Sequence, residues 1–395
     1  MDEIIKVAKS VLGNGYEAGK EVAQSALNQL NQRSPSLALL FSSAGYDQKE
    51  LLRGITEVLP NVPMVGCSGE GVICSDTGSD EGSTAVTLML FSGKGLSLYP
   101  LIAKGLKKNS YRCGEEIAKS VNELPNNGMD TLLLFPDSMT ANTTEILDAL
   151  EKELKRSVMI LGGTSGDMMK FKQTFQYYNG EVFEDVLVAL YITGKYNIDY
   201  LVSHGCEEIG LEQVATKTEA NKIVEIDGRP AWECFREYLP GNPEEFKAED
   251  AFHLCLGELH HLEKTCNDQL IIRMPVGLDK KRGAVQFSVE IPEGSAIHFT
   301  RRDPQVIAQK VIQAFKELLD RNKGKKPLVV FQFDCAGRGR VLYGNNFNQE
   351  VIRPLQAMLD PNVPWIGFHT YGEIAPLCGK TFFHNFTAVI GIIFE

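Results

Sequence analysis

The chain has 395 residues, of which 43% are hydrophobic and 23% are charged, and its formal net charge is −11. This length is typical of two or three domains, and the negative charge disfavours nonspecific binding to nucleic acid or to an anionic membrane. The sequence shows no basic and apolar leader and no apolar run long enough to span a bilayer. We therefore expect no nucleic-acid partner and no membrane insertion.

Residues 1–33 are predicted to form an N-terminal helical segment. Apolar residues recur at helical spacing from Ile5 to Leu12 and again from Ala18 to Leu30, with a break at 13–15. We expect this segment to serve packing only.

Three later segments share one plan. Each has an apolar run of strand length, a stretch with helical spacing, a short apolar run that ends in a glycine-rich loop, and a further apolar strand. The helical stretches are 48–59, 143–154 and 348–359, and the glycine-rich loops lie within 60–73, 157–168 and 361–376. The predicted fold is an α/β protein with mixed sheets, built from three strand–helix–strand–strand repeats.

The first two loops match residue for residue, as GCSGE from Gly66 and GTSGD from Gly163. The third, GFHTYGE from Gly367, has two extra residues between its glycines. A strand–helix–strand crossover makes its two strands parallel, and ligands of open α/β sheets bind beyond the carboxyl ends of such strands. We therefore expect the loops to meet around a small-molecule site.

Between the second and third segments the sequence predicts further strands and two helices. Helices are expected to open at Pro230 and Pro304, because proline suits the first helical turn. Strands are expected at 198–204, 214–218, 270–274 and 284–289. A domain boundary is expected within 219–227.

The nine cysteines of the chain are odd in number and follow no regular spacing. Several lie inside apolar runs. This usage favours reduced thiols and a cytoplasmic location over a disulfide framework.

The motifs resemble those of FIST-domain proteins. The resemblance rests on ALLFSSAG and VPMVGCSGEG in the first half, and on KIVEIDGRPA, FDCAGRG and GFHTYGEIAP in the second. It implies a FIST N-terminal domain over 34–221 and a FIST C-terminal domain over 222–395. The family is regarded as a ligand-sensing module of signal transduction, proposed to bind small molecules such as amino acids. The resemblance thus implies a stand-alone sensor that is read by a separate signalling protein.

Candidate ligand-binding residues come from the three loops and from one arginine. Glycines let a ligand approach the backbone, hydroxyls donate and accept hydrogen bonds, carboxylates could hold an ammonium group, and a guanidinium could grip a carboxylate, a set that would fit a zwitterion. The candidates are Gly66, Cys67, Ser68, Glu70, Gly163, Thr164, Ser165, Asp167, Arg338, His369, Thr370, Tyr371 and Glu373. The alternative is structural, with carboxylates that cap backbone N–H groups and an ion pair between Arg338 and Asp334.

Enzyme chemistry is the main competing class. Cys67 or Cys335 could act as a nucleophile with His369 as its base, although buried cysteine is more often a small apolar side chain. We therefore assign no catalytic residue. A protein-interaction scaffold is a further alternative.

Metal and phosphate sites are not predicted. The cluster of His253, Cys255, His260, His261 and Cys266 contains residue types that bind zinc, but its spacing fits no paired zinc motif. The stretch 379–381 lacks the preceding glycine of a phosphate-binding loop. We expect neither a metal nor a cofactor.

Overall fold

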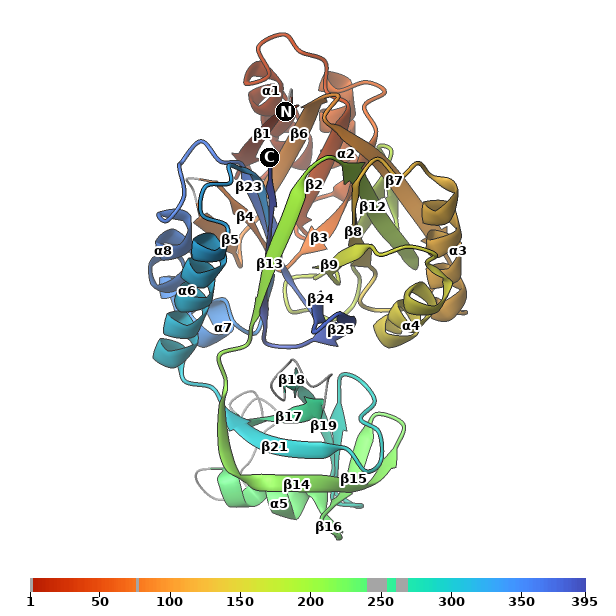
Figure 1. The fold of residues 1–395 in the computed structure, drawn as a ribbon, viewed down its shortest axis with the longest axis vertical. Helices are drawn as coiled ribbons and strands as arrows, with labels where there is room; N and C mark the ends of the chain where they lie inside the picture. Colours follow the sequence, from red (N-terminus) through yellow and green to blue (C-terminus); the bar gives the residue numbers. More distant parts are fainter. Residues whose placement is uncertain (1–2, 76–77, 240–253, 261–268) are drawn as a thin grey trace.

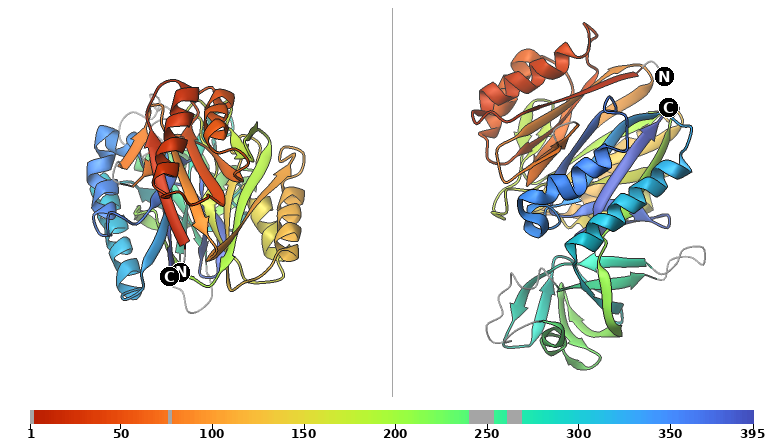
Figure 2. Two further views of the ribbon diagram at one scale, coloured as in Figure 1. Left: turned by 90° about the horizontal axis from the view of Figure 1, so that it is seen from above. Right: turned by 90° about the vertical axis from the view of Figure 1, so that its left-hand side faces the viewer.

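The computed structural model describes residues 3–75, 78–239, 254–260 and 269–395. It consists of a large domain of three six-stranded sheets with helices on the outside, and a small β domain beneath it (Figure 1). The two chain ends lie close together, at the end of the large domain farthest from the small one (Figure 2). The predicted α/β class with mixed sheets is confirmed.

The first sheet has the strand order β1-β6-β2-β3-β10-β11. Strands β2 and β3 are parallel, as expected for strands joined through helix α2, whereas β6 runs antiparallel to β2. Helices α1 and α2 share an apolar core with this sheet. The bounds are β1 Glu3–Ser10, α1 Gly15–Asn28, β2 Leu37–Ser43, α2 Gln48–Val58, β3 Met64–Gly69, β6 Val86–Gly93, β10 Gln176–Tyr178 and β11 Glu181–Phe183.

The prediction of a helical segment over residues 1–33 is wrong for its first part. Residues Glu3–Ser10 form β1, which pairs antiparallel with β6 over its whole length. Ile5 and Val7 contact one apolar core, whereas Ile4 and Ala8 contact another, so the strand is covered on both faces. A strand with two apolar faces has no clean alternation, and its spacing can imitate that of a helix.

The second and third sheets repeat this pairing pattern. Their orders are β25-β24-β9-β8-β12-β7 and β13-β26-β22-β23-β4-β5. The pairs β8–β9 and β22–β23 are parallel, whereas β12 and β26 run antiparallel to β8 and β22. The second sheet and its helices comprise β7 Leu96–Lys104, α3 Ser110–Glu123, β8 Met129–Pro136, α4 Thr143–Glu153, β9 Met159–Gly163, β12 Val186–Gly194, β24 Glu373–Leu377 and β25 Lys380–His384.

The third sheet is accompanied by α-helices, a short 3-10 helix and a π-helical turn. The stretch predicted to be helical at 348–359 is a π-helical turn, η3, followed by the short helix α8. The bounds are β4 Gly71–Cys74, β5 Gly78–Glu81, β13 Asn197–Ser203, α6 Pro304–Arg321, β22 Pro327–Cys335, α7 Arg340–Tyr343, η2 Gly344–Asn346, η3 Asn348–Ile352, α8 Arg353–Gln356, β23 Trp365–Thr370 and β26 Ala388–Phe394.

The three sheets exchange strands in a closed cycle. The hairpin of β4 and β5, which follows β3 in sequence, joins the third sheet because β4 pairs with β23. The hairpin of β10 and β11, which follows β9, joins the first sheet because β10 pairs with β3. The hairpin of β24 and β25, which follows β23, joins the second sheet because β24 pairs with β9. Each sheet is therefore completed by a hairpin from another segment, so the three cannot separate without breaking strand pairs.

The centre of the large domain is aromatic. Phe41 on β2, Phe135 on β8 and Phe333 on β22 are fully buried, with ring centroids 5.3 Å apart for the first two and 6.1 Å for the last two. Full burial of such a side chain contributes about 1.5–3 kcal/mol. These rings join the first strands of all three sheets into one core.

The described part of the small domain is an eight-stranded antiparallel sheet with helix α5 packed against it. Its strand order is β18-β17-β21-β14-β15-β20-β19, with β16 paired to β15. The first and last strands of this order, β18 and β19, are separated in sequence only by Met274. The sheet therefore curls so that its two edges come close together. The predicted boundary between residues 221 and 222 lies in the turn between β14 and β15. The bounds are β14 Glu207–Glu219, β15 Lys222–Ile226, β16 Arg229–Pro230, α5 Ala231–Tyr238, β17 Leu254–His260, β18 Gln269–Arg273, β19 Pro275–Asp279, β20 Ala284–Phe287 and β21 Ala296–Arg301.

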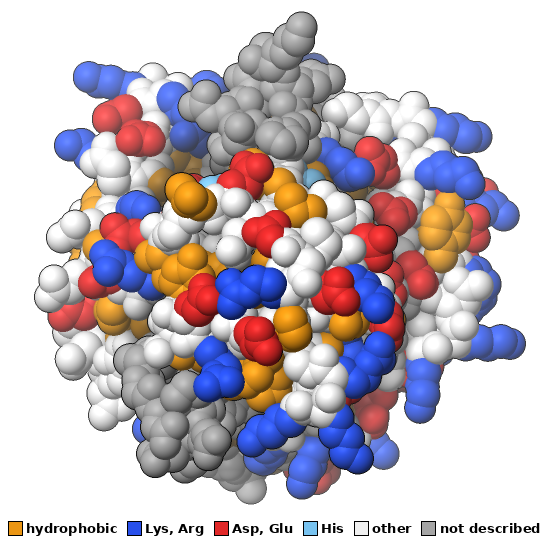
Figure 3. Space-filling model, turned by 90° about the horizontal axis from the view of Figure 1, so that it is seen from below, with side chains coloured by type: hydrophobic (Ala, Val, Ile, Leu, Met, Phe, Trp, Pro, Cys, Tyr) orange, Lys and Arg blue, Asp and Glu red, His pale blue; other side chains and the backbone are white. Residues whose placement is uncertain are grey.

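The lower face of the molecule mixes charges of both signs (Figure 3). Lys and Arg side chains alternate there with Asp and Glu, and no continuous basic patch is visible on the part that is not grey. Within the described ranges, no helix combines the length and the apolar character needed to cross a membrane.

Among the described residues, six cysteines are free and buried, namely Cys67, Cys113, Cys206, Cys234, Cys255 and Cys335, and Cys74 is also buried. Cys378 is disulfide-bonded. The expectation of reduced thiols therefore holds for those six and is wrong for Cys378.

Candidate functional site

Each glycine-rich loop begins at a glycine that has no room for a side chain. A Cβ at Gly66 would lie 1.7 Å from the carbonyl oxygen of Leu40, its neighbour on the parallel strand. The corresponding distance is 2.2 Å at Gly162 and 2.0 Å at Gly367. Within each of the three parallel pairs, the two strands therefore approach closely at the point where the loop starts.

This comparison corrects the alignment of the first two loops by one residue. Gly162, not Gly163, pairs with the first strand as Gly66 does. Gly163 pairs instead with Glu373 of the third segment, and a Cβ there would lie 2.4 Å from Cγ2 of Thr370.

The three loops meet, as the sequence predicted, and they bind one another through the backbone. The N–H of Glu70 donates to the carbonyl of His369 at 2.9 Å, and that of Gly166 donates to Ser68 at 2.9 Å. The N–H of Thr164 donates to the carbonyl of Gly372 at 2.8 Å, and the carbonyl of Thr164 accepts from the N–H of Tyr371 at 3.2 Å. Every loop therefore contacts the other two. The side chains of Ser68, Ser165, His369, Thr370 and Glu373 are 0% exposed at this junction.

Tyr371 links the carboxylates nearer to the surface. Its hydroxyl donates to Oδ1 of Asp167 at 2.6 Å, lies 3.5 Å from Oε2 of Glu70, and accepts from the N–H of Met169 at 2.7 Å. The ring stacks on Phe171, with centroids 4.7 Å apart. Burial raises the pKa of Glu70 to about 7. This carboxylate can therefore gain or lose a proton near neutral pH.

Asp167 caps its own loop. Its carboxylate accepts from the backbone N–H of Phe171 at 2.8 Å, Lys172 at 2.6 Å and Gln173 at 3.0 Å. Burial opposes ionisation, but the Tyr371 hydroxyl and these three donors outweigh it and lower the pKa. This is the structural role considered for the loop carboxylates.

Glu373 lies deeper and is fully buried. Oε1 accepts from the Thr370 hydroxyl, and Oε2 accepts from the N–H of Thr387 at 3.1 Å. Burial raises its pKa to about 8, so the protonated form prevails at pH 7.

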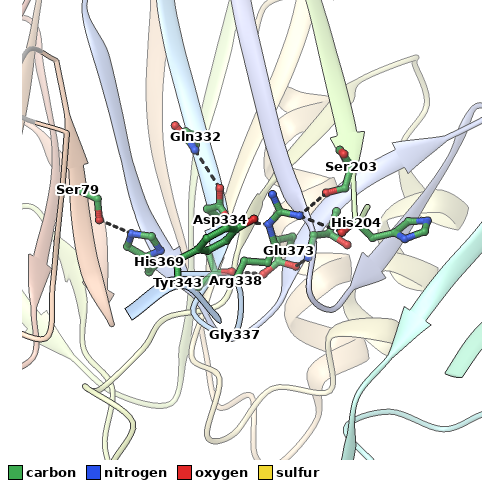
Figure 4. Close-up of polar contacts among 12 residues, drawn as sticks. Ser79, Ser203, His204, Gln332, Asp334, Gly337, Arg338, Tyr343, His369 and Glu373 are labelled. Atoms are coloured by element: carbon green, nitrogen blue, oxygen red, sulfur yellow. Dashed lines mark hydrogen bonds and ion pairs between the residues drawn. The ribbon is translucent and has the colours of Figure 1, made fainter. Parts of the chain in front are cut away.

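Arg338 and Asp334 form the predicted ion pair, and both side chains are 0% exposed (Figure 4). Nε of Arg338 lies 3.0 Å from Oδ1 of Asp334, whose Oδ2 accepts from Gln332 at 3.0 Å. Nη1 donates to the carbonyls of Ser203 at 3.0 Å and His204 at 3.1 Å. Nη2 is buried and has no partner within the described residues.

His369 is a second buried group with an unused atom. Its Nε2 lies 2.6 Å from the Ser79 hydroxyl, whereas its Nδ1 has no partner among the described residues. Burial lowers its pKa to about 4, so the ring is neutral at pH 7. Its ring contacts Phe347, which in turn contacts Tyr343, and Figure 4 shows the Tyr343 ring between His369 and Arg338. The segment 340–348 therefore covers this part of the site.

Sequence reasoning missed the residues that β5 and the covering segment contribute. Ser79 lies on β5, and the side chain of Asn348 binds both its N–H, at 2.5 Å, and its carbonyl, at 2.7 Å. Glu81 accepts from the N–H of Arg340 at 2.5 Å, and burial raises its pKa to about 8. Ser79 and Glu81 lie beside His369 and Arg340 only because the β4–β5 hairpin joins the third sheet. No local sequence pattern predicts that pairing.

The proposed nucleophiles lie in unfavourable surroundings. Cys67 is 0% exposed and Cys335 is 4% exposed, and burial raises the pKa of both thiols well above the usual value. Thiolate is the reactive form of cysteine. We therefore expect both to resist an aromatic disulfide reagent in the folded protein and to react on unfolding. Ser34→Cys, at an exposed position, is the matched control and should react at once. Rapid labelling of Cys67 or Cys335 under native conditions would restore the enzyme alternative.

The histidine- and cysteine-rich stretch is only partly described. His253, His261 and Cys266 lie outside the described residues. Cys255 is buried, and Nε2 of His260 lies 3.3 Å from Oε2 of Glu258. Within the described parts of the chain, no three His, Cys, Asp or Glu side chains are grouped so as to hold a metal ion.

Comparison with known proteins finds two matching domain families. The FIST N domain matches residues 36–229, and the FIST C domain matches residues 231–376. Curated relatives from Mycobacterium bovis and Methanocaldococcus jannaschii are each 24% identical, over 384 and 425 residues. The first alignment covers 96% of both chains, and the second covers 99% of this chain and 78% of the relative. Both relatives are named as uncharacterized proteins.

Among solved structures, PurLQS from Thermotoga maritima aligns with 99% of this chain and 72% of its own. The identity is 10% and the TM-score is 0.25, a likeness too low to support any argument.

Proposed function

This chain belongs to the FIST family, whose domains are generally sensory domains of signal transduction, and on that premise we propose that it is a cytoplasmic sensor of a small metabolite. An amino acid or a similar zwitterion is the ligand class that the loop residues favour. The occupied and empty states would be read by a separate signalling protein.

One observation carries the proposal: two buried groups near the paired ends of β22 and β23, beside the third loop, have unused donor or acceptor capacity. Nη2 of Arg338 and Nδ1 of His369 have no partner among the described residues. Buried polar groups are seldom left unpaired, and such a group calls for an explanation. A ligand carboxylate would supply an acceptor for Arg338, and Glu70 would balance a ligand ammonium group.

Ligand entry would require a conformational change, because the loops and segment 340–348 cover these atoms. Gly344 begins η2 with φ of 58°, a conformation that glycine adopts without strain. Opening of this segment would expose Arg338 and His369, and a ligand that binds the open form would shift the equilibrium toward it. The signalling partner would then distinguish the two forms.

A thermal-shift panel of free amino acids and related metabolites tests the proposal. A ligand at one hundred times its dissociation constant should stabilise the folded state by about 2.7 kcal/mol. Glu70→Gln should remove the response to a zwitterion while keeping the shape of the side chain. Glu57→Gln, at an exposed site on α2, is the matched control and should respond like the parent protein. The absence of a response to every metabolite class would count against a sensor of this kind.

A further inference from the structure

A separate cavity lies between the large and small domains. Its volume is about 180 Å³, and its lining includes Lys310 and His384 from the large domain, Leu270 from the small domain and His204 from the segment that connects them. Drug-sized ligands occupy cavities of roughly 300–1,000 Å³. A cavity of this size suits only a small molecule.

The cavity adjoins the place where the chain passes between the domains. Strand β13 ends at Ser203 and β14 begins at Glu207, so His204 and Gly205 belong to the connection. Gly205 has φ of 71°, and a Cβ there would lie 2.8 Å from Cα of Ile307 on α6. Binding sites occur preferentially at such interfaces between domains.

The hydrogen bonds of the two histidines fix their tautomers. Nδ1 of His204 accepts from the N–H of Cys206 at 3.0 Å, so the proton of the neutral ring is on Nε2. Nε2 of His384 donates to the carbonyl of Ala375 at 3.0 Å, so Nδ1 is left as an acceptor. Burial lowers the pKa of His204 to about 4 and that of His384 to about 3, and both rings are therefore neutral at pH 7.

These tautomers leave one donor and one acceptor unused. Neither Nε2 of His204 nor Nδ1 of His384 has a hydrogen-bond partner among the described residues. The His204 ring points away from the Arg338 guanidinium, which holds the backbone carbonyls of Ser203 and His204 from the other side (Figure 4). The cavity is thus chemically distinct from the cluster of glycine loops.

The charges around the cavity favour an anion. Nζ of Lys310 lies 3.4 Å from the carbonyl of Cys206 and forms no ion pair in the described part of the chain. After burial, the charged groups that lower the pKa of His204 are Lys310 and Arg338, and for His384 they include Arg273. Arg338 is neutralised by Asp334 and Arg273 by Glu258, so among the described residues around the cavity Lys310 carries the one positive charge without an ion-pair partner.

We propose that this cavity binds a small 2-hydroxy carboxylate, at a site separate from that of the proposed sensor ligand. The carboxylate accepts hydrogen bonds from Lys310 and from Nε2–H of His204. The adjacent hydroxyl donates to Nδ1 of His384. A 2-amino acid is disfavoured, because its ammonium group would add a second positive charge beside Lys310.

Histidine-ring NMR spectra of the full chain test the proposal, because the chain contains only seven histidines. The His204 and His384 signals are assigned with His204→Gln and His384→Gln. L-Lactate should shift both signals saturably, whereas L-alanine and acetate, which replace or lack the hydroxyl, should bind at least about tenfold more weakly, a difference of about 1.4 kcal/mol. Lys310→Met should weaken lactate binding by about tenfold or more, because a hydrogen bond to a charged group is lost.

Two controls separate this site from the sensor site. Lys316→Met, on the same helix but outside the cavity lining, should bind lactate normally. Glu70→Gln should also bind lactate normally, even if it abolishes a response to amino acids. The proposal is overturned if lactate gives no saturable shift up to about 10 mM, ten times a dissociation constant of about 1 mM. It is equally overturned if alanine binds as well as lactate, or if Lys310→Met binds lactate like the parent protein.

Discussion

Replacement of Arg338 by methionine is expected to lower the free energy of unfolding by about 3–5 kcal/mol. The Arg338 and Asp334 side chains are each 0% exposed, and methionine would leave the Asp334 carboxylate buried with Gln332 as its remaining side-chain partner. The carbonyls of Ser203 and His204 would also lose their donor. A buried charge without its counterion is among the most destabilising changes a single substitution can make.

Urea unfolding followed by circular dichroism measures this effect. Arg53→Met is the matched control, because Arg53 pairs with Glu50 on the surface of α2 with side chains 58% and 45% exposed. Loss of such an exposed pair should cost no more than about 1 kcal/mol. The double variant Asp334→Asn with Arg338→Met should recover part of the loss, since no unpaired charge then remains. An Arg338→Met protein as stable as the Arg53→Met control would show that the buried pair does not hold the site together.

The local elements of the large domain were largely predictable. Helices α2, α4 and α6 begin at their predicted starts, because helical spacing of apolar residues marks the first two and a proline suited to the first turn marks the third. The parallel pairs β2–β3, β8–β9 and β22–β23 followed from the crossover rule. Strand β1 was missed because both of its faces are apolar.

The arrangement of the loops was predictable in part. Their glycines and their place after parallel strands indicated a meeting point, and the backbone bonds from Gly166 to Ser68 and from Glu70 to His369 confirm it. The degree to which the loop side chains are buried was not predictable, because it depends on the exchange of hairpins among the three sheets. A contact such as that between Ser79 and His369 joins residues 290 positions apart, and local propensity contains no information about it.

Gly66→Ala is expected to destabilise the protein by about 2–6 kcal/mol. The added Cβ would lie 1.7 Å from the carbonyl oxygen of Leu40, and the backbone φ of 155° is unfavourable for any residue with a side chain. Forced overpacking costs about 1–3 kcal/mol, and a residue held in a sparsely populated backbone conformation costs about 1–3 kcal/mol. The obstacle is backbone within a paired strand, so a rotamer change cannot relieve the contact.

The same substitution should also disturb the loops, because β3 must move away from β2 to make room. Ser68 lies two residues after Gly66, and both its carbonyl and its hydroxyl bind Gly166. A shift of β3 would therefore weaken the junction of the first two loops as well as the sheet. Hydrogen exchange should show faster exchange at the Gly166 amide, alongside the lower midpoint in urea. Gly13→Ala is the control, because a Cβ at that position would have no atom within 4 Å, and its effect should stay within about 0.5 kcal/mol. If Gly66→Ala were as stable as Gly13→Ala and left exchange at the Gly166 amide unchanged, the close approach of β2 and β3 at Gly66 would not be needed for the junction of the loops.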